Sequence, residues 1–317
     1  MKTALLIITD LEYYVPTQVL LESLNRNSPE FMSKVDVKIY SDSALNPECI
    51  VRDLDIYDYN KTTYGPQVFK MMSMLIFAMA ELKNDYDRII YLDCDCLVNK
   101  EISELCEYDL DGKGLGACRE WHYPGTLKEL VYGNPKVYGK DHYSRELMVD
   151  PEDYINSGVL VIDCHKIKDG IWDRYIGNVE KYCYPDQDFL YVEYLGDTEF
   201  LPQTYNAKGE GYLRNILTDE QIDMYKAALE NSKIIHFVGG CKPWHTWVNA
   251  ISSFTRQLPY MLWIEMLRNV KNPYEQWIYD RVMGQVVDSI PISLRGRSEA
   301  FDGDVDALHL KFLNEMI

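Results

Sequence analysis

Short apolar runs bounded by turn residues alternate along the chain with stretches whose apolar residues recur at helical spacing. The runs at 4–8, 35–40, 88–92, 158–162 and 233–238 predict strands, and the stretches at 18–24, 67–82 and 171–182 predict helices. This alternation is typical of an α/β fold in which helices flank a mostly parallel central sheet. Ligands of such sheets bind beyond the carboxyl ends of the strands, so the residues that follow each run are candidates for a functional site.

The pattern changes near residue 250. Of the 317 residues, those up to about 250 carry the strand–helix alternation, whereas 254–270 and 273–287 have helical spacing only. We therefore predict one α/β domain at 1–250 and a C-terminal helical extension at 251–317. A domain of this size buries enough apolar surface to fold without disulfides or a structural metal.

The charge balance limits what the chain can bind through its general electrostatic field. Lys and Arg number 32 and Asp and Glu number 50, so the formal net charge is −18. A field of this sign disfavours nucleic acid and anionic membranes as partners. A phosphate-bearing ligand must therefore be held locally, by a metal ion or by a few placed cations.

Targeting signals and cysteine usage predict a cytoplasmic protein without a transmembrane segment. No apolar stretch reaches the roughly 18 residues of a membrane span, and the apolar run at 3–9 is cut by Asp10, which is typical of a buried strand rather than a signal peptide. The eight cysteines show no paired spacing for zinc and no disulfide framework, which favours reduced thiols.

The most informative motif is Asp93-Cys94-Asp95, directly after the apolar run at 88–92. On a strand, positions i and i+2 share one face, so the two carboxylates are expected together there, with Cys94 and Cys96 on the opposite face in the core. Adjacent carboxylates repel each other unless a cation lies between them, and a divalent cation shared with phosphate oxygens suits that position. An acidic turn that merely closes a strand is the alternative.

A second motif follows the apolar run at 233–238. The run contains His236, a glycine turn begins at Gly239, and Lys242 comes six residues after the histidine. Glycine lets the backbone approach a ligand closely, a lysine offers a point charge to a phosphate, and an imidazole can complete a metal site. A histidine with its hydrogen bonds satisfied in the core is the alternative.

Taken in order, these and other segments resemble glycosyltransferase family 8, the retaining group that includes glycogenin and the bacterial lipopolysaccharide galactosyl- and glucosyltransferases. The resemblance spans about residues 3–247. The matching stretches are Ile8-Thr9-Asp10 with Tyr13, RIIYLDCDCLV, ISELCEYDLDGKGLGA, YINSGVLVID, YPDQDFLY, LPQTYN and IIHFVGGCKPWH.

The resemblance implies a GT-A type nucleotide-sugar-binding fold and the transfer of a hexose, glucose or galactose, from a UDP-sugar to an acceptor that the sequence does not identify. It also implies that Asp93, Asp95 and His236 are ligands of a Mn²⁺ ion that bridges the diphosphate, with Mg²⁺ as the alternative. An imidazole among carboxylates favours Mn²⁺ over Mg²⁺. Lys242 and the backbone of Gly239 match the residues that hold the diphosphate.

The remaining matches concern the two ends of the donor. Thr9, Asp10 and Tyr13 match the uridine end, with Tyr13 positioned to stack on the uracil. The wall around the sugar is matched by Asn156, Ser157, Asp186 and Gln187, with Asp186 as candidate nucleophile and Gln187 as candidate stabiliser.

Two further matches are looser. Glu120 stands where relatives often carry an acidic sugar-binding residue. Lys70 is the counterpart of a basic residue on the helix before the Asp-x-Asp strand, although its distance of 93 − 70 = 23 residues from Asp93 is longer than in relatives.

Several alternatives stay open. A catalytically silent UDP-sugar-binding protein would carry the same motifs. A haloacid-dehalogenase-like phosphatase also begins with Asp-x-Asp, but Leu97 stands where that family usually has Thr or Val, and its motif follows the first strand. The Gly112-x-Gly-x-Gly116 segment lacks a following helical pattern, so a turn is favoured over a dinucleotide site. Tyr212 lies near the position of glycogenin's self-glucosylated tyrosine, and an ordinary loop tyrosine is the alternative.

Overall fold

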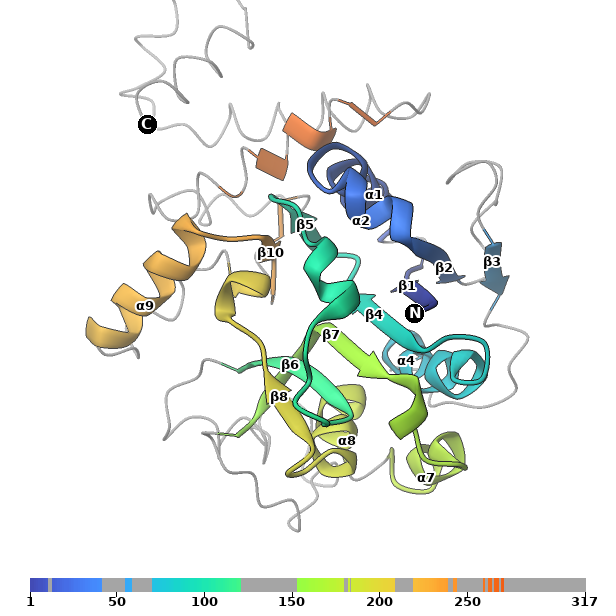
Figure 1. The fold of residues 1–317 in the computed structure, drawn as a ribbon. Coiled ribbons are helices and arrows are strands. Elements are labelled where there is room, and N and C mark those ends of the chain that lie inside the picture. The colour runs from blue at the N-terminus through green and yellow to red at the C-terminus, as the bar shows by residue number, and fades with distance from the viewer. Residues whose placement is uncertain are drawn as a thin grey trace, which may run out of the picture.

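A computed structural model describes residues 1–10, 13–41, 55–58, 70–120, 153–179, 182, 184–208, 219–238 and 242–243, together with individual positions between 259 and 270. Within these residues, seven strands form one sheet in the order β3-β2-β1-β4-β7-β6-β8, and three more form a small sheet in the order β5-β10-β9 (Figure 1).

The first half of the large sheet is parallel. It contains β1 (Thr3–Ile8), β2 (Val35–Ser41), β3 (Asp55–Asp58) and β4 (Arg88–Leu92). Between β1 and β2 the chain forms α1 (Tyr14–Asn27) and α2 (Pro29–Lys34), and α4 (Lys70–Leu82) precedes β4.

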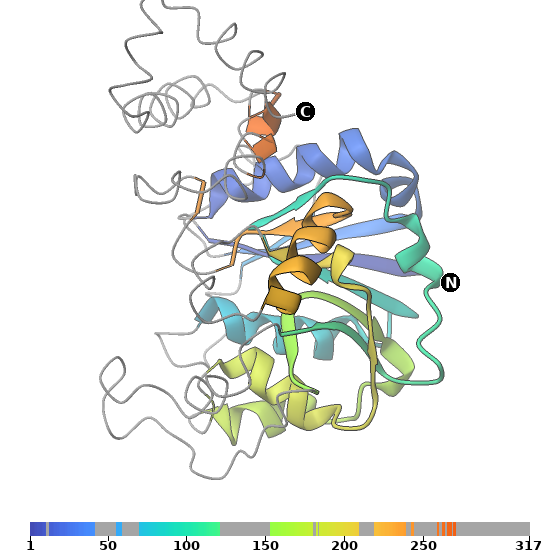
Figure 2. The same cartoon turned by 90° about the vertical axis from the view of Figure 1, so that its left-hand side faces the viewer.

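Helices cover both faces of this half, which explains why β1 is apolar at successive positions. Ala4, Leu6 and Ile8 belong to the core cluster that includes α4, whereas Leu5 and Ile7 belong to the cluster that includes α1 and α2. The turned view shows α1 and α4 on opposite sides of the sheet (Figure 2). A strand buried on both faces has no polar face, as expected for the centre of a parallel sheet.

The second half of the sheet reverses direction. β7 (Ile155–Asp163) runs antiparallel to β4 and to β6 (Leu115–Arg119), and β8 (Thr198–Phe200) is parallel to β6. Four of the six strand pairings are thus parallel, which confirms the prediction of a mostly parallel sheet. Because β7 is antiparallel to β4, its first residues lie at the carboxyl end of β4.

Two helices of the second half pack on the α4 side. These are α7 (Ile171–Ile176) and α8 (Pro185–Glu193), whose side chains Tyr175 and Phe189 belong to the same core cluster as α4. The helix predicted at 171–182 is shorter than expected, because α7 ends at Ile176 and Gly177 caps it.

The small sheet joins distant parts of the chain. β5 (Cys96–Val98) pairs antiparallel with β10 (Ile234–His236), which is parallel to β9 (Ala207–Lys208). The helix α9 (Asp219–Glu230) precedes β10, and short 3₁₀ turns occupy Ser103–Glu107, Cys164–Lys166 and Gln203–Tyr205.

Little of the predicted C-terminal extension falls within the described residues. Positions 259, 262–263 and 265–267 are helical, and Glu265 forms a 3.1 Å ion pair with Arg26 of α1. The boundary near residue 250 stays a prediction, and 271–317 lie outside the described residues. None of the described helices combines the length and the apolar character that a membrane span requires.

Candidate active site

The two aspartates of the Asp-x-Asp motif lie on a turn between β4 and β5. β4 ends at Leu92 and β5 begins at Cys96. The Asp93 N–H donates to the Gly158 carbonyl at 2.8 Å, and the Cys96 N–H donates to the Asp93 carbonyl at 3.0 Å. The expectation that both aspartates occupy a strand is therefore wrong, because the chain leaves the sheet at Asp93 and the alternation of strand faces ends there.

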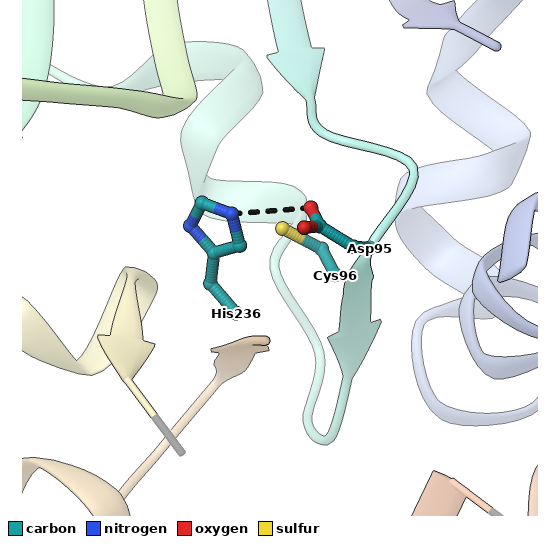
Figure 3. A group of neighbouring side chains, drawn as sticks. All are labelled: Asp95, Cys96 and His236. Atoms are coloured by element: carbon teal, nitrogen blue, oxygen red, sulfur yellow. Dashed lines mark ion pairs between the residues drawn. The ribbon is translucent and has the colours of Figure 1, made fainter. Parts of the chain in front are cut away.

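His236 lies against both carboxylates. Its Nε2 atom is 3.1 Å from Asp95 Oδ1 and 3.4 Å from Asp93 Oδ2, although 141 residues separate it from Asp95 in the sequence (236 − 95 = 141; Figure 3). Burial lowers the pKa of His236, but the two carboxylates raise it more, to about 9. In the absence of another cation, the ring therefore supplies the positive charge between the aspartates.

Cys96 corrects a second expectation. Its sulfur and the ligand atoms of Asp95 and His236 all lie within 4.8 Å of one another, so Cys96 does not point to the opposite face (Figure 3). The reason is the pairing of β5 with β10, which sets Cys96 directly opposite His236. Burial and the nearby aspartates raise the Cys96 pKa well above its usual value, so the sulfur is a neutral thiol and a poor metal ligand.

Lys242 completes the charged group. Its Nζ atom forms an ion pair with Asp95 Oδ2, donates to the Phe237 carbonyl at 2.5 Å, and lies 6.0 Å from the centre of the Tyr13 ring. Burial raises the pKa of Asp95, but His236 and Lys242 outweigh it and hold that pKa well below its usual range. Asp95 is thus an ionised carboxylate even though its side chain is only 10% exposed.

The residues matched to the uridine end gather where β1 passes into α1. The Asp10 Oδ1 atom accepts the Tyr13 N–H at 3.0 Å, which fixes the turn. The Thr9 side chain is fully buried and shares a 2.6 Å hydrogen bond with Thr17. Thr9 thus anchors this edge internally, and the proposed contact of these residues with uridine stays a prediction.

The residues matched to the sugar wall meet at the same edge. Ser157 lies near the start of β7, and Asp186 and Gln187 lie in the first turn of α8. The Ser157 hydroxyl donates to Asp186 Oδ2 at 3.1 Å, and its N–H donates to Gln187 Oε1 at 3.1 Å. A proline at the first helical position with acidic residues after it is a helix-start signal, and it could have located α8 in the sequence.

Asp186 has an unusual protonation equilibrium. Burial raises the pKa of this carboxyl, and the negative charge of Asp93 raises it further, to about 7. The hydrogen bond from Ser157 opposes the shift only in part. A positive charge near Asp93 would favour the ionised form.

Two tyrosines in the site were not identified from the sequence. The Tyr91 hydroxyl donates to Asp93 Oδ1 at 2.5 Å. The Tyr154 hydroxyl donates to Asp188 Oδ1 at 2.5 Å and accepts from Gln187 Nε2 at 2.9 Å. Both lie inside matched motifs, but tyrosines are frequent in this chain, so no local signal separates them from the others.

Glu120 is buried in an ion pair with Lys208, and its Oε2 accepts from Asn156 Nδ2 at 2.6 Å. Its carboxylate is therefore engaged by protein groups, and a direct sugar contact stays a prediction. Lys70 begins α4, but its side chain lies outside the described parts of the chain, as do Gly239 and Tyr212.

The donor set suits a divalent cation. Asp93 and Asp95 offer carboxylate oxygens at 3.4 Å and 3.1 Å from the imidazole Nε2 atom of His236, at the edge of the sheet. Carboxylates with one imidazole fit Mn²⁺ better than Mg²⁺, which prefers oxygen ligands alone.

A comparison with known protein families decides the family. The sequence model of "Glycosyl transferase family 8" matches residues 5–248. The chain belongs to glycosyl transferase family 8. This excludes the phosphatase alternative, and the family match contains both the Asp-x-Asp turn and His236.

Two relatives show how much of the chain is similar to named proteins. The chain is 29% identical over 184 residues to a lipopolysaccharide 1,2-glucosyltransferase of Escherichia coli, covering 56% of this chain and 50% of the relative. It is 25% identical over 262 residues to a putative glycosyltransferase of Haemophilus influenzae, covering 77% and 74%. The chain thus spans about half the length of the first of these relatives.

Solved structures confirm the GT-A type fold of this family 8 chain. The bifunctional glycosyltransferase WbbM, in its apo structure, superposes with a TM-score of 0.68 at 21% identity, covering 88% of this chain and 51% of that one. The galactosyltransferase LgtC, solved with donor and acceptor sugar analogues, gives 0.57 at 17% identity, covering 86% and 98%.

Proposed function

We propose that this chain is a retaining, metal-dependent hexosyltransferase that moves glucose or galactose from a UDP-sugar to an acceptor. The observation that carries the proposal is the meeting of Asp93, Asp95 and His236 at the edge where β4 ends and β7 begins. In a chain of net charge −18, this cluster is a local device of the kind that a diphosphate requires.

The chain's own residues would divide the work as follows. Asp93, Asp95 and the His236 Nε2 atom would hold the cation, and Mn²⁺ would supply positive charge against the charge that grows on the leaving diphosphate. Lys242, which lies beside Asp95, would add a second positive charge there. The uridine end would be held by Asp10 and Tyr13 at the start of α1.

The sugar-side residues have rigid positions that suit a bound hexose. Gln187 is fixed at both ends of its amide, by Ser157 N–H and by the Tyr154 hydroxyl. Asp186 is the candidate nucleophile for the oxocarbenium-like reaction centre. Retention could instead follow from attack by the acceptor on the departing side. A glycosyl-enzyme that can be trapped in the wild type and is lost in Asp186→Asn would support the carboxylate route, whereas its absence from the wild type would favour the other.

The experiment that tests the proposal measures UDP release from UDP-glucose and from UDP-galactose, with Mn²⁺, with Mg²⁺ and with EDTA. We expect release from one donor with Mn²⁺, less with Mg²⁺ and none with EDTA. UDP binding without any turnover of either donor would instead support a silent binding protein.

We also propose a cytoplasmic location and an acceptor site formed by loops. Cys94, Cys96, Cys106, Cys118 and Cys164 are free and buried, which supports the proposed cytoplasmic location. The acceptor, whether saccharide, lipid-linked or protein, would be contacted by segments such as 121–143, which lie outside the described residues. Thermal shift with each UDP-sugar and Mn²⁺ would rank the donors, because a ligand of the folded state raises its apparent stability.

A further inference from the structure

The second nitrogen of the His236 ring contacts Asn206, which ends the matched stretch LPQTYN but was given no role in the sequence analysis. Nδ1 lies 2.9 Å from Oδ1 of Asn206, which follows the 3₁₀ turn Gln203–Tyr205 and is almost fully buried. Nε2, on the other side of the ring, faces Asp93 and Asp95. The role of the ring at the cation site therefore depends on which nitrogen keeps a hydrogen when the ring is neutral.

A chain of hydrogen bonds fixes that choice. The backbone N–H of Gly158 can only donate, and it lies 3.0 Å from Asn156 Oδ1, so the oxygen of the Asn156 amide must face it. Asn206 Nδ2 donates to the same oxygen at 2.7 Å. The Asn206 amide is thereby oriented with its oxygen toward His236.

The hydrogen bond on the other side of Asn156 requires the same orientation of its amide. The Asn156 Nδ2 atom donates to Glu120 Oε2 at 2.6 Å, and Glu120 forms a buried ion pair with Lys208. A carboxylate held by a lysine accepts hydrogen bonds and does not donate them. Both Gly158 and Glu120 thus impose the same orientation on Asn156.

We propose that Asn206 is a positioning residue that holds a hydrogen on His236 Nδ1 and so directs the Nε2 lone pair to the cation. This inference rests on the proposed function, because it assigns a role toward the same metal site. Ligating histidines commonly donate their other ring N–H to such a partner, and loss of the partner typically weakens metal binding about 10- to 100-fold.

Gly158 strengthens the argument because its backbone contacts the same ring through Cε1 and Nδ1. A Cβ atom built on Gly158 would lie 2.0 Å from Cε1 and 2.4 Å from Nδ1 of His236, so the ring packs directly against this backbone. The glycine thus sets the position of the ring, while its N–H sets the direction of the hydrogen bonds through Asn156 and Asn206.

The test compares Mn²⁺ affinity in the full chain, measured by electron paramagnetic resonance of free Mn²⁺. We expect Asn206→Ala to bind Mn²⁺ at least about tenfold more weakly than wild type. Asn206→Asp, which keeps an oxygen facing Nδ1, should bind more tightly than Asn206→Ala. The matched control is Asn99→Ala, which removes an amide bonded to Ser232 rather than to His236 and should leave the affinity unchanged.

A second readout does not depend on a metal. In protein labelled with ¹⁵N-histidine, we expect a slowly exchanging Nδ1–H signal from His236, assigned by its loss in His236→Asn. Asn206→Ala should abolish that signal, and Asn206→Asp should keep it. Circular dichroism would show that each variant is folded.

The outcomes separate the two proposals. An unchanged Mn²⁺ affinity or an unchanged Nδ1–H signal in folded Asn206→Ala overturns the role of Asn206 while leaving the metal site intact. Absence of Mn²⁺ binding by wild type overturns the metal site itself, and with it the positioning role that depends on it.

Discussion

The candidate site has a charged part and a neutral part, and the two are stabilised differently. The charged part, which we call the charged cluster, consists of Asp93, Asp95, His236 and Lys242. The neutral part, which we call the amide network, consists of Tyr154, Asn156, Ser157, Gln187 and Asn206. In the charged cluster, neighbouring charges shift the pKa values of Asp95, His236 and Lys242, whereas in the amide network the direction of each hydrogen bond is set by a neighbouring group.

This difference separates residues that we expect to act on the substrate from residues that hold the site rigid. In the charged cluster, His236 lies against both carboxylates and Lys242 pairs with Asp95, so its members are held together by opposite charges. The amide network is already satisfied within the protein and provides a fixed frame. We therefore expect changes in the charged cluster to affect activity most, and changes in the amide network to affect stability as well.

The largest effect is expected for Asp95→Ala. This change removes a candidate metal ligand and leaves His236 and Lys242 without their shared partner. We expect UDP release to fall by at least about 100-fold, the size typical for loss of one preorganised electrostatic group. The control is Asp85→Ala, an exposed aspartate before β4. Equal activity of wild type and Asp95→Ala would refute the metal assignment.

A smaller loss is expected for Lys242→Met. The variant keeps the length of the side chain but removes the charge that lies beside Asp95. A charged hydrogen bond is worth about 1.5–3 kcal/mol, so kcat/KM for the UDP-sugar should fall about 10- to 100-fold. Lys233→Met removes a lysine that pairs with Glu104 instead. If both lysine variants lose activity equally, the effect is not specific to the charged cluster.

Tyr154→Phe tests how much the amide network contributes to the stability of the folded protein. The hydroxyl joins Asp188 to Gln187, and its loss leaves buried polar atoms without their partner. We expect the free energy of unfolding in denaturant to fall by about 1–3 kcal/mol, with a smaller loss of activity than for Asp95→Ala. The control Tyr86→Phe removes a hydroxyl that donates to the exposed Asp36. A larger stability loss in that control would contradict the assignment.

The smallest effect on stability is expected for Asp186→Asn, and it depends on pH. The folded-state pKa of Asp186 is about 7, above the usual 3.8, so the folded protein holds a proton that the unfolded chain releases between these values. The ionised carboxylate therefore destabilises the fold increasingly as pH rises from about 4 to 7. In EDTA, we expect the variant to melt a few degrees higher than wild type at pH 8.

The same comparison at low pH provides the control for Asp186. Near pH 4, the carboxyl is protonated in the folded protein, so the two proteins should melt at similar temperatures. A difference in melting temperature that is the same at pH 4 and pH 8 would show that charge is not the cause.

Much of the site could be predicted from residue types near strand ends. The run at 88–92 and the following aspartates are local features, and the apolar spacing of β1 and β4 reports their burial on both faces. The turn at Asp93–Asp95 could not be predicted, because an i, i+2 pattern reads the same on a strand and on a turn. The placement of Cys96 beside His236 could not be predicted either, because it depends on the pairing of β5 with β10.

The sequence by itself determined the α/β class, the family and the residue types that can bind a cation, because periodicity and motif are local properties of the chain. Only the tertiary structure decided which atoms meet. Lys242 reaches Asp95 across 147 residues, and Asn206 reaches His236 across 30, because the antiparallel β7 and the small sheet bring these segments to one edge. Such contacts depend on strand order and direction, which no local pattern encodes.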